Sequence, residues 1–218
     1  MIRLSASRLL QLAKKPRSFQ DKRGKSDERW ALFATHLPKS GSVLDVGCDE
    51  GEFTERCANA GLFALGVERS DVLHLATKHR LGSGSMLSFM QADTDLRFFE
   101  SIPRFDCILF LSVHHHFWRT HGRAYAEDVL RLAAKKCDLI IYEAPIRTSR
   151  YRPKDTDREV PDFVDLDADS AARWYENWIR TIVPGVEVQR LGFSPCVGER
   201  EPVRPVLRID CRPHGASA

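Results

Sequence analysis

The stretch V-L-D-V-G-C-D-E-G-E, residues 43–52, decides how the rest of the chain is interpreted. Its first four residues are mostly apolar and predict a short buried strand, and the following turn contains Gly47 and Gly51. Gly47 has no Cβ, so the backbone can turn tightly there and approach a ligand closely. A helical pattern begins directly behind the turn, and the unpaired N–H groups of a helix N-terminus favour an anionic or carboxylate-bearing ligand. Such a unit is typical of nucleotide binding, or of a plain tight connection between a strand and a helix.

Three further apolar strands follow, and each leads into side chains that can bind a ligand. Residues 63–67 lead into Glu68, residues 86–91 lead into Asp93, and residues 106–111 lead towards three histidines. A carboxylate at the tip of the second strand can accept hydrogen bonds from both hydroxyls of a ribose. Because parallel strands end at one edge of a sheet, this order predicts an open α/β sheet with its ligand site at that edge.

With these residues the chain resembles the class I S-adenosylmethionine-dependent methyltransferases, over about residues 26–145. Asp45, Gly47 and Gly51 match that family's first motif, acid-x-Gly-x-Gly-x-Gly, which holds the methionine end of the cofactor. Asp49 departs from the motif, because the commonest form has glycine at that position. The resemblance implies that the chain binds S-adenosylmethionine and releases S-adenosylhomocysteine.

The resemblance also assigns roles along the rest of the sheet edge. Glu68 matches the acid that binds the ribose, and Asp93 matches the acid that contacts the adenine amino group. The full set of expected cofactor-binding residues is Asp45, Gly47, Cys48, Gly51, Phe53, Glu68, Arg69, Asp93, Thr94, Leu111 and Ser112.

The expected fold class is α/β, a single-domain, doubly wound, seven-stranded sheet with helices on both faces. By resemblance to the class I methyltransferase fold, the sheet is mostly parallel and carries an antiparallel C-terminal hairpin. A fifth strand is expected at residues 138–142, and the hairpin strands at about residues 186–191 and 205–211. Apolar periodicity and capping residues predict helices at residues 26–36 (capped by Ser26 or Asp27), 50–60, 71–80, 95–100 (capped by Thr94 or Asp95), 119–134 and 168–182.

Composition predicts one soluble domain, since 43% of the 218 residues are apolar and 29% are charged. Six cysteines without CxxC or zinc-ligand spacing indicate reduced thiols and a cytoplasmic protein, and no apolar run approaches the length of a membrane span. The net charge is +3, but residues 1–29 contain nine Lys/Arg and three Asp/Glu, so the remainder is slightly acidic. That balance argues against a general nucleic-acid binder, which spreads positive charge over its working face.

The chain divides into a basic segment, residues 1–25, and a methyltransferase domain, residues 26–213, with a lid-like insertion at about residues 147–169. A polar segment as long as this insertion is usually functional or disordered. The basic segment has several interpretations: a flexible tail, a helix that covers the cofactor, a membrane-surface or nucleic-acid contact, or an organellar transit peptide.

Three histidines, His114, His115 and His116, follow the fourth strand, where the resemblance places the chemistry on the substrate. Methyl transfer to a hydroxyl needs a group that accepts the proton, and imidazole titrates near neutral pH. The segment reads as extended, with neighbouring side chains pointing in alternate directions, so one or two of the three can face the substrate. His115 is the first candidate for the base. Alternatively, one histidine packs under the cofactor while another caps the following helix.

A metal site is a weaker interpretation of the same residues. Two imidazoles and Glu143 would suit a transition metal, whereas Mg²⁺ prefers oxygen ligands. Adjacent histidines on an extended segment chelate a metal poorly. No metal is therefore expected.

The expected substrate-binding residues are Glu143, Arg147, Arg150 and Tyr151. Guanidinium groups bind phosphate and carboxylate bidentately, so the arginine-rich loop at residues 147–158 can clamp an anionic substrate. The alternative is a solvated loop whose arginines pair with neighbouring acids.

The segment behind the fourth strand also bears on the acceptor. DNA and protein amine methyltransferases of this class often carry Asn/Asp-Pro-Pro-Tyr/Phe there, whereas residues 112–118 read S-V-H-H-H-F-W. The predicted function is therefore methyl transfer (EC 2.1.1) to an oxygen of a sugar, a glycan or another anionic small molecule. One alternative is an RNA methyltransferase whose basic N-terminus and arginine-rich lid hold phosphates, with steeply salt-dependent binding. Another is a non-catalytic cofactor-binding partner subunit, which an exposed apolar patch would favour.

Overall fold

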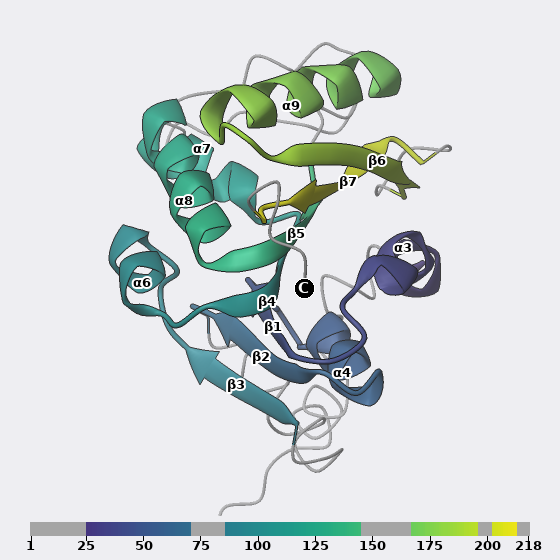
Figure 1. Ribbon diagram of the computed structural model, residues 1–218, viewed down its shortest axis with the longest axis vertical. Coiled ribbons are helices and arrows are strands. Elements are labelled where there is room, and N and C mark those ends of the chain that lie inside the picture. The colour runs from purple at the N-terminus through teal and green to yellow at the C-terminus, as the bar shows by residue number, and fades with distance from the viewer. Residues whose placement is uncertain (1–24, 71–85, 145–166, 196–201, 213–218) are drawn as a thin grey trace, which may run out of the picture.

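The computed structural model describes residues 25–70, 86–144, 167–195 and 202–212, and every structural statement below refers to these residues (Figure 1). They form a seven-stranded sheet in the order β3-β2-β1-β4-β5-β7-β6. Strands β1 to β5 pair in parallel, and β7 pairs antiparallel with β5 and β6. The strands are β1 (Ser42–Val46), β2 (Phe63–Glu68), β3 (Leu87–Gln91), β4 (Phe105–Leu111), β5 (Cys137–Glu143), β6 (Glu187–Ser194) and β7 (Arg204–Asp210).

The predicted α/β fold class is confirmed, including the antiparallel hairpin formed by β6 and β7. The central strands are continuous apolar runs because both of their faces are covered. In β4, for example, the four residues from Cys107 to Phe110 are all fully buried. An apolar run of this kind can be recognised without knowledge of its neighbours, which is why the strands were predictable.

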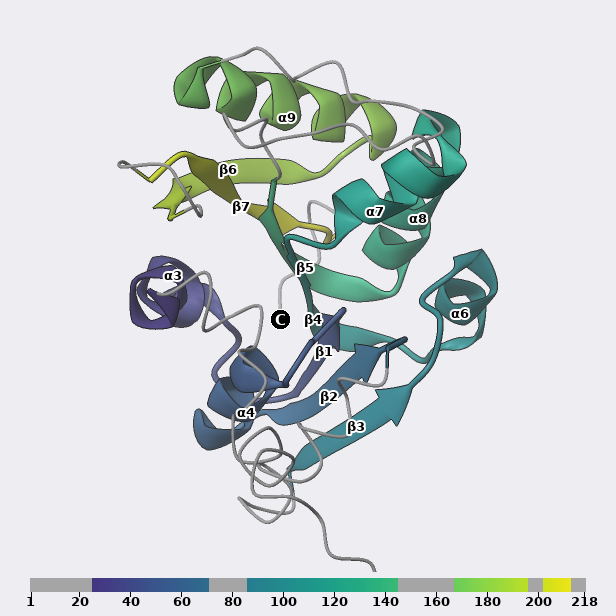
Figure 2. The ribbon, with the colours of Figure 1, turned by 180° about the vertical axis from the view of Figure 1, so that it is seen from behind.

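Helices cover both faces of the sheet (Figures 1 and 2). On one face, α3 (Ser26–Phe33), a 3-10 turn (Ala34–His36) and α4 (Glu52–Asn59) pack on a core that includes Phe33, Phe53 and Leu109. On the other face, a second core includes Phe110, Tyr142 and Trp178. It is covered by α6 (Leu96–Ser101), α7 (His114–His121), α8 (Arg123–Lys135) and α9 (Ala168–Ile182).

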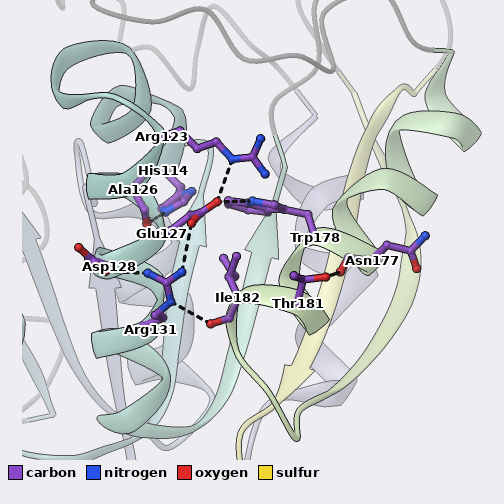
Figure 3. A network of polar contacts seen from close by, with 10 residues as sticks. All are labelled: His114, Arg123, Ala126, Glu127, Asp128, Arg131, Asn177, Trp178, Thr181 and Ile182. Atoms are coloured by element: carbon purple, nitrogen blue, oxygen red, sulfur yellow. Dashed lines mark hydrogen bonds and ion pairs between the residues drawn. The ribbon is translucent and has the colours of Figure 1, made fainter.

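A carboxylate of α8 joins this helix to α9 (Figure 3). Glu127 accepts hydrogen bonds from Nε1 of Trp178 at 3.1 Å and from Nε of Arg123 at 2.8 Å. Arg131 donates to the other oxygen of Glu127 and to the backbone carbonyl of Ile182, at the end of α9. These bonds fix α9 over the sheet through both its apolar side and its C-terminus.

The region behind β4 differs from the prediction. The sequence predicts an extended histidine segment followed by a helix over 119–134, but the structure has two helices, α7 and α8, separated at Gly122. Gly122 has φ 93°, a conformation that ends one helix and lets the next begin at a new angle. His114, His115 and His116 therefore occupy the first turn of α7, and their side chains do not alternate as on a strand.

The start of α3 is a second correction. Neither Ser26 nor Asp27 caps this helix, because Lys25 occupies the N-cap position with φ 64° and no side-chain hydrogen bond. The Ser26 hydroxyl instead donates to a carboxylate oxygen of Glu52 at 2.9 Å, which links α3 to α4. The cap expected at Thr94 or Asp95 is confirmed for Asp95, which accepts a bond from the Phe98 amide.

Several expectations fall outside the described residues: the helix at 71–80, residues 1–24 of the basic segment, and residues 147–166 of the insertion. In the described ranges, no helix has the length and apolar character needed to cross a membrane. The five cysteines that lie in these ranges are all free thiols.

His114, one of the predicted bases, is a core residue with 1% of its surface exposed. Its Nε2 lies 2.8 Å from the carbonyl oxygen of Ala126, and its Nδ1 lies 2.9 Å from the Tyr142 hydroxyl. A carbonyl oxygen only accepts, so Nε2 carries the proton and Nδ1 accepts from Tyr142. Burial lowers the pKa of His114 to about 4. Because both ring nitrogens are bonded inside the protein, a catalytic base at His114 does not fit the structure.

Replacing Tyr142 with Phe is expected to lower the free energy of unfolding by about 1–3 kcal/mol, because the buried Nδ1 of His114 would lose its donor. Chemical denaturation followed by circular dichroism measures this loss. Tyr125→Phe is a matched control, since the half-buried Tyr125 hydroxyl accepts only a long 3.4 Å bond from the Leu96 amide. It should cost less than about 1 kcal/mol. Equal losses in the two variants would contradict the role given to the Tyr142–His114 bond.

Candidate cofactor and acceptor site

The polar residues predicted for the site lie at the edge of the sheet where the parallel strands end. β1 runs into Gly47, β2 ends at Glu68, β4 is followed by Ser112, and β5 ends at Glu143. Leu111 pairs with Glu143 in the register, so the ends of β4 and β5 are neighbours. The strand order reverses between β1 and β4, and ligands of such sheets bind outside the carboxyl ends at that point.

The glycine loop, residues 47–51, has a backbone that explains its glycines. Gly47 and Gly51 have φ of 67° and 73°, in the left-handed region that side chains disfavour. A Cβ on Gly47 would lie 2.6 Å from Cγ2 of Val113, so no side chain fits there. The close neighbour at Gly47 is therefore Val113, from the connection between β4 and α7. Asp49 also has a positive φ of 53°, although it is not a glycine.

Glu68 is tied to the glycine loop by backbone hydrogen bonds. Its Oε2 accepts from the amide of Asp49 at 3.3 Å, and its Oε1 accepts from the amide of Ser70 at 2.9 Å. The half-buried carboxylate is thus held in one orientation at the end of β2. Each ionised oxygen can accept a further hydrogen bond, which leaves Glu68 able to bind a ligand while it fixes the loop.

Three of the expected cofactor-binding side chains lie in the core instead. Asp45 is 3% exposed and accepts a 2.7 Å bond from the Thr54 hydroxyl, and burial raises its pKa to about 6. Cys48 is buried, and the Phe53 ring packs against the guanidinium of Arg29 at 4.7 Å. These side chains support the loop from beneath, and the cofactor roles expected for the three residues stay predictions.

The other expected cofactor residues remain along the same edge. Arg69 and Asp93 are exposed just beyond the ends of β2 and β3, and Thr94 and Leu111 are half-buried. The cofactor contacts expected for these four residues stay predictions.

The Glu143 carboxylate accepts hydrogen bonds from three other parts of the fold, and a fourth part is joined through Ser112. The Arg29 guanidinium of α3 donates through Nε at 3.2 Å and through Nη2 at 2.7 Å. The hydroxyls of Ser112, behind β4, and Ser194, at the end of β6, also donate to it. Arg204, at the start of β7, donates to the Ser112 hydroxyl at 2.7 Å. We call these five residues the Glu143 cluster.

The predicted substrate contact of Glu143 is wrong. Glu143 is 1% exposed, and both of its oxygens already accept from protein donors. Its function is to hold the ends of β4, β5 and β6 and the helix α3 together. Ser112 has φ 64°, and its bonds to Glu143 and Arg204 stabilise this unfavourable conformation immediately before α7.

His115 is placed differently from His114. Its Nδ1 is buried and has no hydrogen-bond partner among the described residues. Burial is the largest of the causes that lower the pKa of His115 well below its ordinary value, and its neighbours His116, Arg204 and Arg119 act in the same direction. The His115 ring lies against the exposed ring of His116, with a centroid distance of 4.1 Å. His115 is therefore a neutral imidazole at physiological pH, with a lone pair that can accept a proton.

Sequence reasoning missed Arg29, Thr54, Ser194 and Arg204. Arg29 and Glu143 are 114 residues apart, and Ser194 and Glu143 are 51 apart. No local pattern marks an arginine on an amphipathic helix as the partner of a distant carboxylate. Only the strand order, which brings β4, β5, β7 and β6 side by side, could have suggested that these ends meet.

The remaining predicted residues, Arg147, Arg150 and Tyr151, lie outside the described residues. The same holds for most of the basic segment and for the arginine-rich loop, on which the RNA alternative rests. In the described ranges, no group of three or more His, Cys, Asp or Glu side chains is arranged to hold a metal ion.

Removing either partner of the buried ion pair should be costly. We expect Glu143→Gln and Arg29→Met each to lower the free energy of unfolding by about 3–5 kcal/mol, because each leaves a buried polar group without its partner. The variant that carries both substitutions should lose less free energy of unfolding than the sum of the two single losses. Chemical denaturation of the unmodified protein, the two single variants and the double variant gives this double-mutant cycle.

The exposed pair Arg104–Asp138, joined at 2.6 Å, is the matched control. The same cycle with Arg104→Met and Asp138→Asn should give a coupling below about 1 kcal/mol. Additive losses at Arg29 and Glu143 would show that the two residues do not act as a pair.

Comparison with known proteins agrees with this geometry. Residues 43–136 match the family model for a methyltransferase domain. The bifunctional kinase-methyltransferase WbdD has a similar structure, with a TM-score of 0.66 and 16% identity over 87% of this chain and 40% of that chain. Magnesium protoporphyrin IX methyltransferase (ChlM) from Synechocystis PCC 6803, solved with bound S-adenosylmethionine, has a TM-score of 0.55 and 19% identity over 84% of this chain and 76% of that chain. A search of curated proteins finds no match.

The chain spans about two fifths of the length of WbdD. At 16% identity, the structural similarity establishes a shared fold and nothing more specific. The matched domain covers the glycine loop, Glu68 and the three histidines. The match over residues 43–136 shows a methyltransferase domain, and the sheet has the strand order of the class I methyltransferase fold that these structures share.

Proposed function

We propose that this chain transfers the methyl group of S-adenosylmethionine to an oxygen of an anionic small molecule, such as a sugar or glycan that carries a phosphate or carboxylate. The observation that carries the proposal is the neutral imidazole of His115, which stands just behind β4 with an unpartnered Nδ1. A hydroxyl acceptor must lose a proton during methyl transfer, and a neutral imidazole can take it.

The glycine loop and Glu68 suit the cofactor. Each Glu68 oxygen accepts one backbone amide, from Asp49 or Ser70, and keeps a second lone pair. These two lone pairs match the two hydroxyls of a ribose. Asp93, exposed just beyond β3, is the proposed partner of the adenine amino group. When bound, the cofactor supplies an electrophilic methyl group on a sulfonium.

The acceptor side is positively charged. The permanent cations that act on His115 are Arg204 and Arg119, and the Ser112 hydroxyl accepts a hydrogen bond from one nitrogen of Arg204. Guanidinium groups bind phosphate and carboxylate strongly. An anionic group on the acceptor would therefore position its hydroxyl beside His115, which favours a phosphorylated or acidic sugar over a neutral one.

An acceptor screen tests the proposal as a whole. Formation of S-adenosylhomocysteine is measured with phosphorylated sugars and sugar acids, each beside its neutral parent sugar. We expect turnover with members of the anionic set and little with the neutral parents. Turnover of the neutral sugars alone would contradict the proposal that the positive charges near His115 bind an anionic group of the acceptor. A folded protein that binds neither S-adenosylmethionine nor S-adenosylhomocysteine would remove the proposed function.

Replacing Glu68 with Gln should weaken S-adenosylmethionine binding by roughly tenfold or more, because hydrogen bonds to a charged group contribute about 1.5–3 kcal/mol. Calorimetric titration measures the change. Glu100→Gln, an exposed residue at the opposite end of the sheet, is the charge-matched control and should bind as the unmodified protein does. An unchanged dissociation constant for Glu68→Gln would exclude Glu68 as the ribose ligand.

Replacing His115 with Gln should lower kcat by about 10²–10⁴-fold while S-adenosylmethionine binding stays unchanged, since the loss is confined to proton transfer. His116→Gln is the control and should lower kcat far less. The acid limb of the kcat/KM profile should lie below the ordinary histidine pKa, because burial keeps His115 unprotonated in the free enzyme. A rate for His115→Gln within about threefold of the unmodified enzyme would contradict this role.

A further inference from the structure

We propose that Asp49 makes the cofactor site selective for charge, so that it binds the sulfonium of S-adenosylmethionine in preference to the neutral thioether of S-adenosylhomocysteine. This inference rests on the proposed function, and it concerns a residue that departs from the glycine of the family motif. Its consequence is release of the product: methyl transfer would itself remove the charge that the loop attracts.

The position of the Asp49 side chain is costly for the protein alone. Its backbone has φ 53°, where a glycine would be free of strain. Its Oδ2 is buried and has no hydrogen-bond partner among the described residues. Burying a carboxylate oxygen removes its hydration, and without a hydrogen-bond partner nothing offsets that loss of free energy. Glycine at this position would remove both costs, and the hydrogen bond that the Asp49 carboxylate accepts from the Glu50 backbone amide is local to the loop.

The charges around Asp49 have the same sign as its own. Burial, the largest cause, and the neighbouring carboxylates Glu50 and Glu68 together raise the pKa of Asp49 to about 6, against a lowering by the Glu50 backbone amide. Asp45 lies beneath the same loop. The Arg29 charge acts on Asp45 but is held by Glu143. A cation brought by a ligand is thus the missing complement of these acids.

Both ligands carry the ammonium of their amino acid part, but only the cofactor carries a second cation, the sulfonium. S-adenosylmethionine carries an ammonium, a carboxylate and a sulfonium, whereas S-adenosylhomocysteine has lost the sulfonium charge. In the transfer, the S–CH₃ bond breaks and its electron pair stays on sulfur, the O–CH₃ bond forms, and the hydroxyl proton passes to His115. The two ligands are otherwise alike, so a difference in their affinities that depends on Asp49 measures a charge effect.

Calorimetric titration of the full chain with both ligands tests the inference. Asp49→Asn is the main variant, because Asn keeps the side-chain shape and tolerates a left-handed backbone. We expect the ratio of the two dissociation constants, product over cofactor, to fall roughly fivefold or more in Asp49→Asn, which corresponds to about 1 kcal/mol. Asp49→Gly should show the same fall, since the charge is again removed.

The control is Glu187→Gln, which removes one exposed carboxylate at the start of β6, at the opposite edge of the sheet. Its ratio should equal that of the unmodified protein. Unchanged melting in circular dichroism shows that the Asn variant is folded. If this folded variant keeps the original ratio, or loses affinity for both ligands equally, Asp49 acts on loop shape and the inference is overturned. Failure of the unmodified protein to bind either ligand would instead count against the proposed function.

The pH dependence provides a second readout. Asp49 is charged above about pH 6, so the preference for the cofactor should be complete near neutrality and decline as the pH falls through that value. Asp45 has a pKa raised to a similar value by burial and titrates in both proteins. The difference between the profiles of the unmodified protein and Asp49→Asn therefore belongs to Asp49. Identical profiles would overturn the inference.

Discussion

The ion pair between Arg29 and Glu143 is the interaction on which the rest of the site depends. Both side chains are almost completely buried, so both have lost the hydration that stabilised their charges. The Coulombic attraction of a buried pair offsets this cost only when further hydrogen bonds satisfy the remaining oxygen lone pairs. Here Ser112 and Ser194 provide those bonds. Because each donor comes from a different element, satisfying one carboxylate fixes α3 and the ends of β4, β5 and β6 to one another.

This constraint reaches the candidate base through the backbone. Ser112 is held in a left-handed conformation by Glu143 on one side and Arg204 on the other, and α7 begins two residues later. The direction in which α7 leaves the sheet therefore depends on the Glu143 cluster. Tyr142 and Ala126 then hold His114 in the core, which fixes the first turn of α7 from inside. With His114 anchored, the neighbouring His115 has a defined position without any hydrogen bond of its own at Nδ1.

The limits of prediction from sequence follow from the range of each interaction. Strands β1 to β5 and the acids at their ends were predictable, because apolar runs and the residues that follow them are local features. The first turn of α7 was not, since three consecutive histidines have neither the period of a strand nor that of a helix. The Glu143 cluster was not predictable either: each of its bonds joins residues far apart in the chain, and its donors are ordinary Arg and Ser side chains. Glu143 was noticed as a carboxylate at a strand end, but only the three-dimensional arrangement shows that its oxygens are occupied.

The two sides of the proposed site have opposite charge, and this bears on why an anionic acceptor would be needed. Asp45, Asp49 and Glu68 lie on the cofactor side, whereas Arg119, Arg204 and His116 act on His115 at the acceptor side. During transfer to a hydroxyl, positive charge would leave the sulfonium and appear on the imidazole of His115. The surrounding cations oppose that charge in the free protein, which makes His115 a weak base. A bound phosphate or carboxylate would neutralise part of their field and raise the proton affinity of His115. On this reasoning, the acceptor's anionic group both positions the hydroxyl and strengthens the base that deprotonates it. A neutral acceptor would do neither.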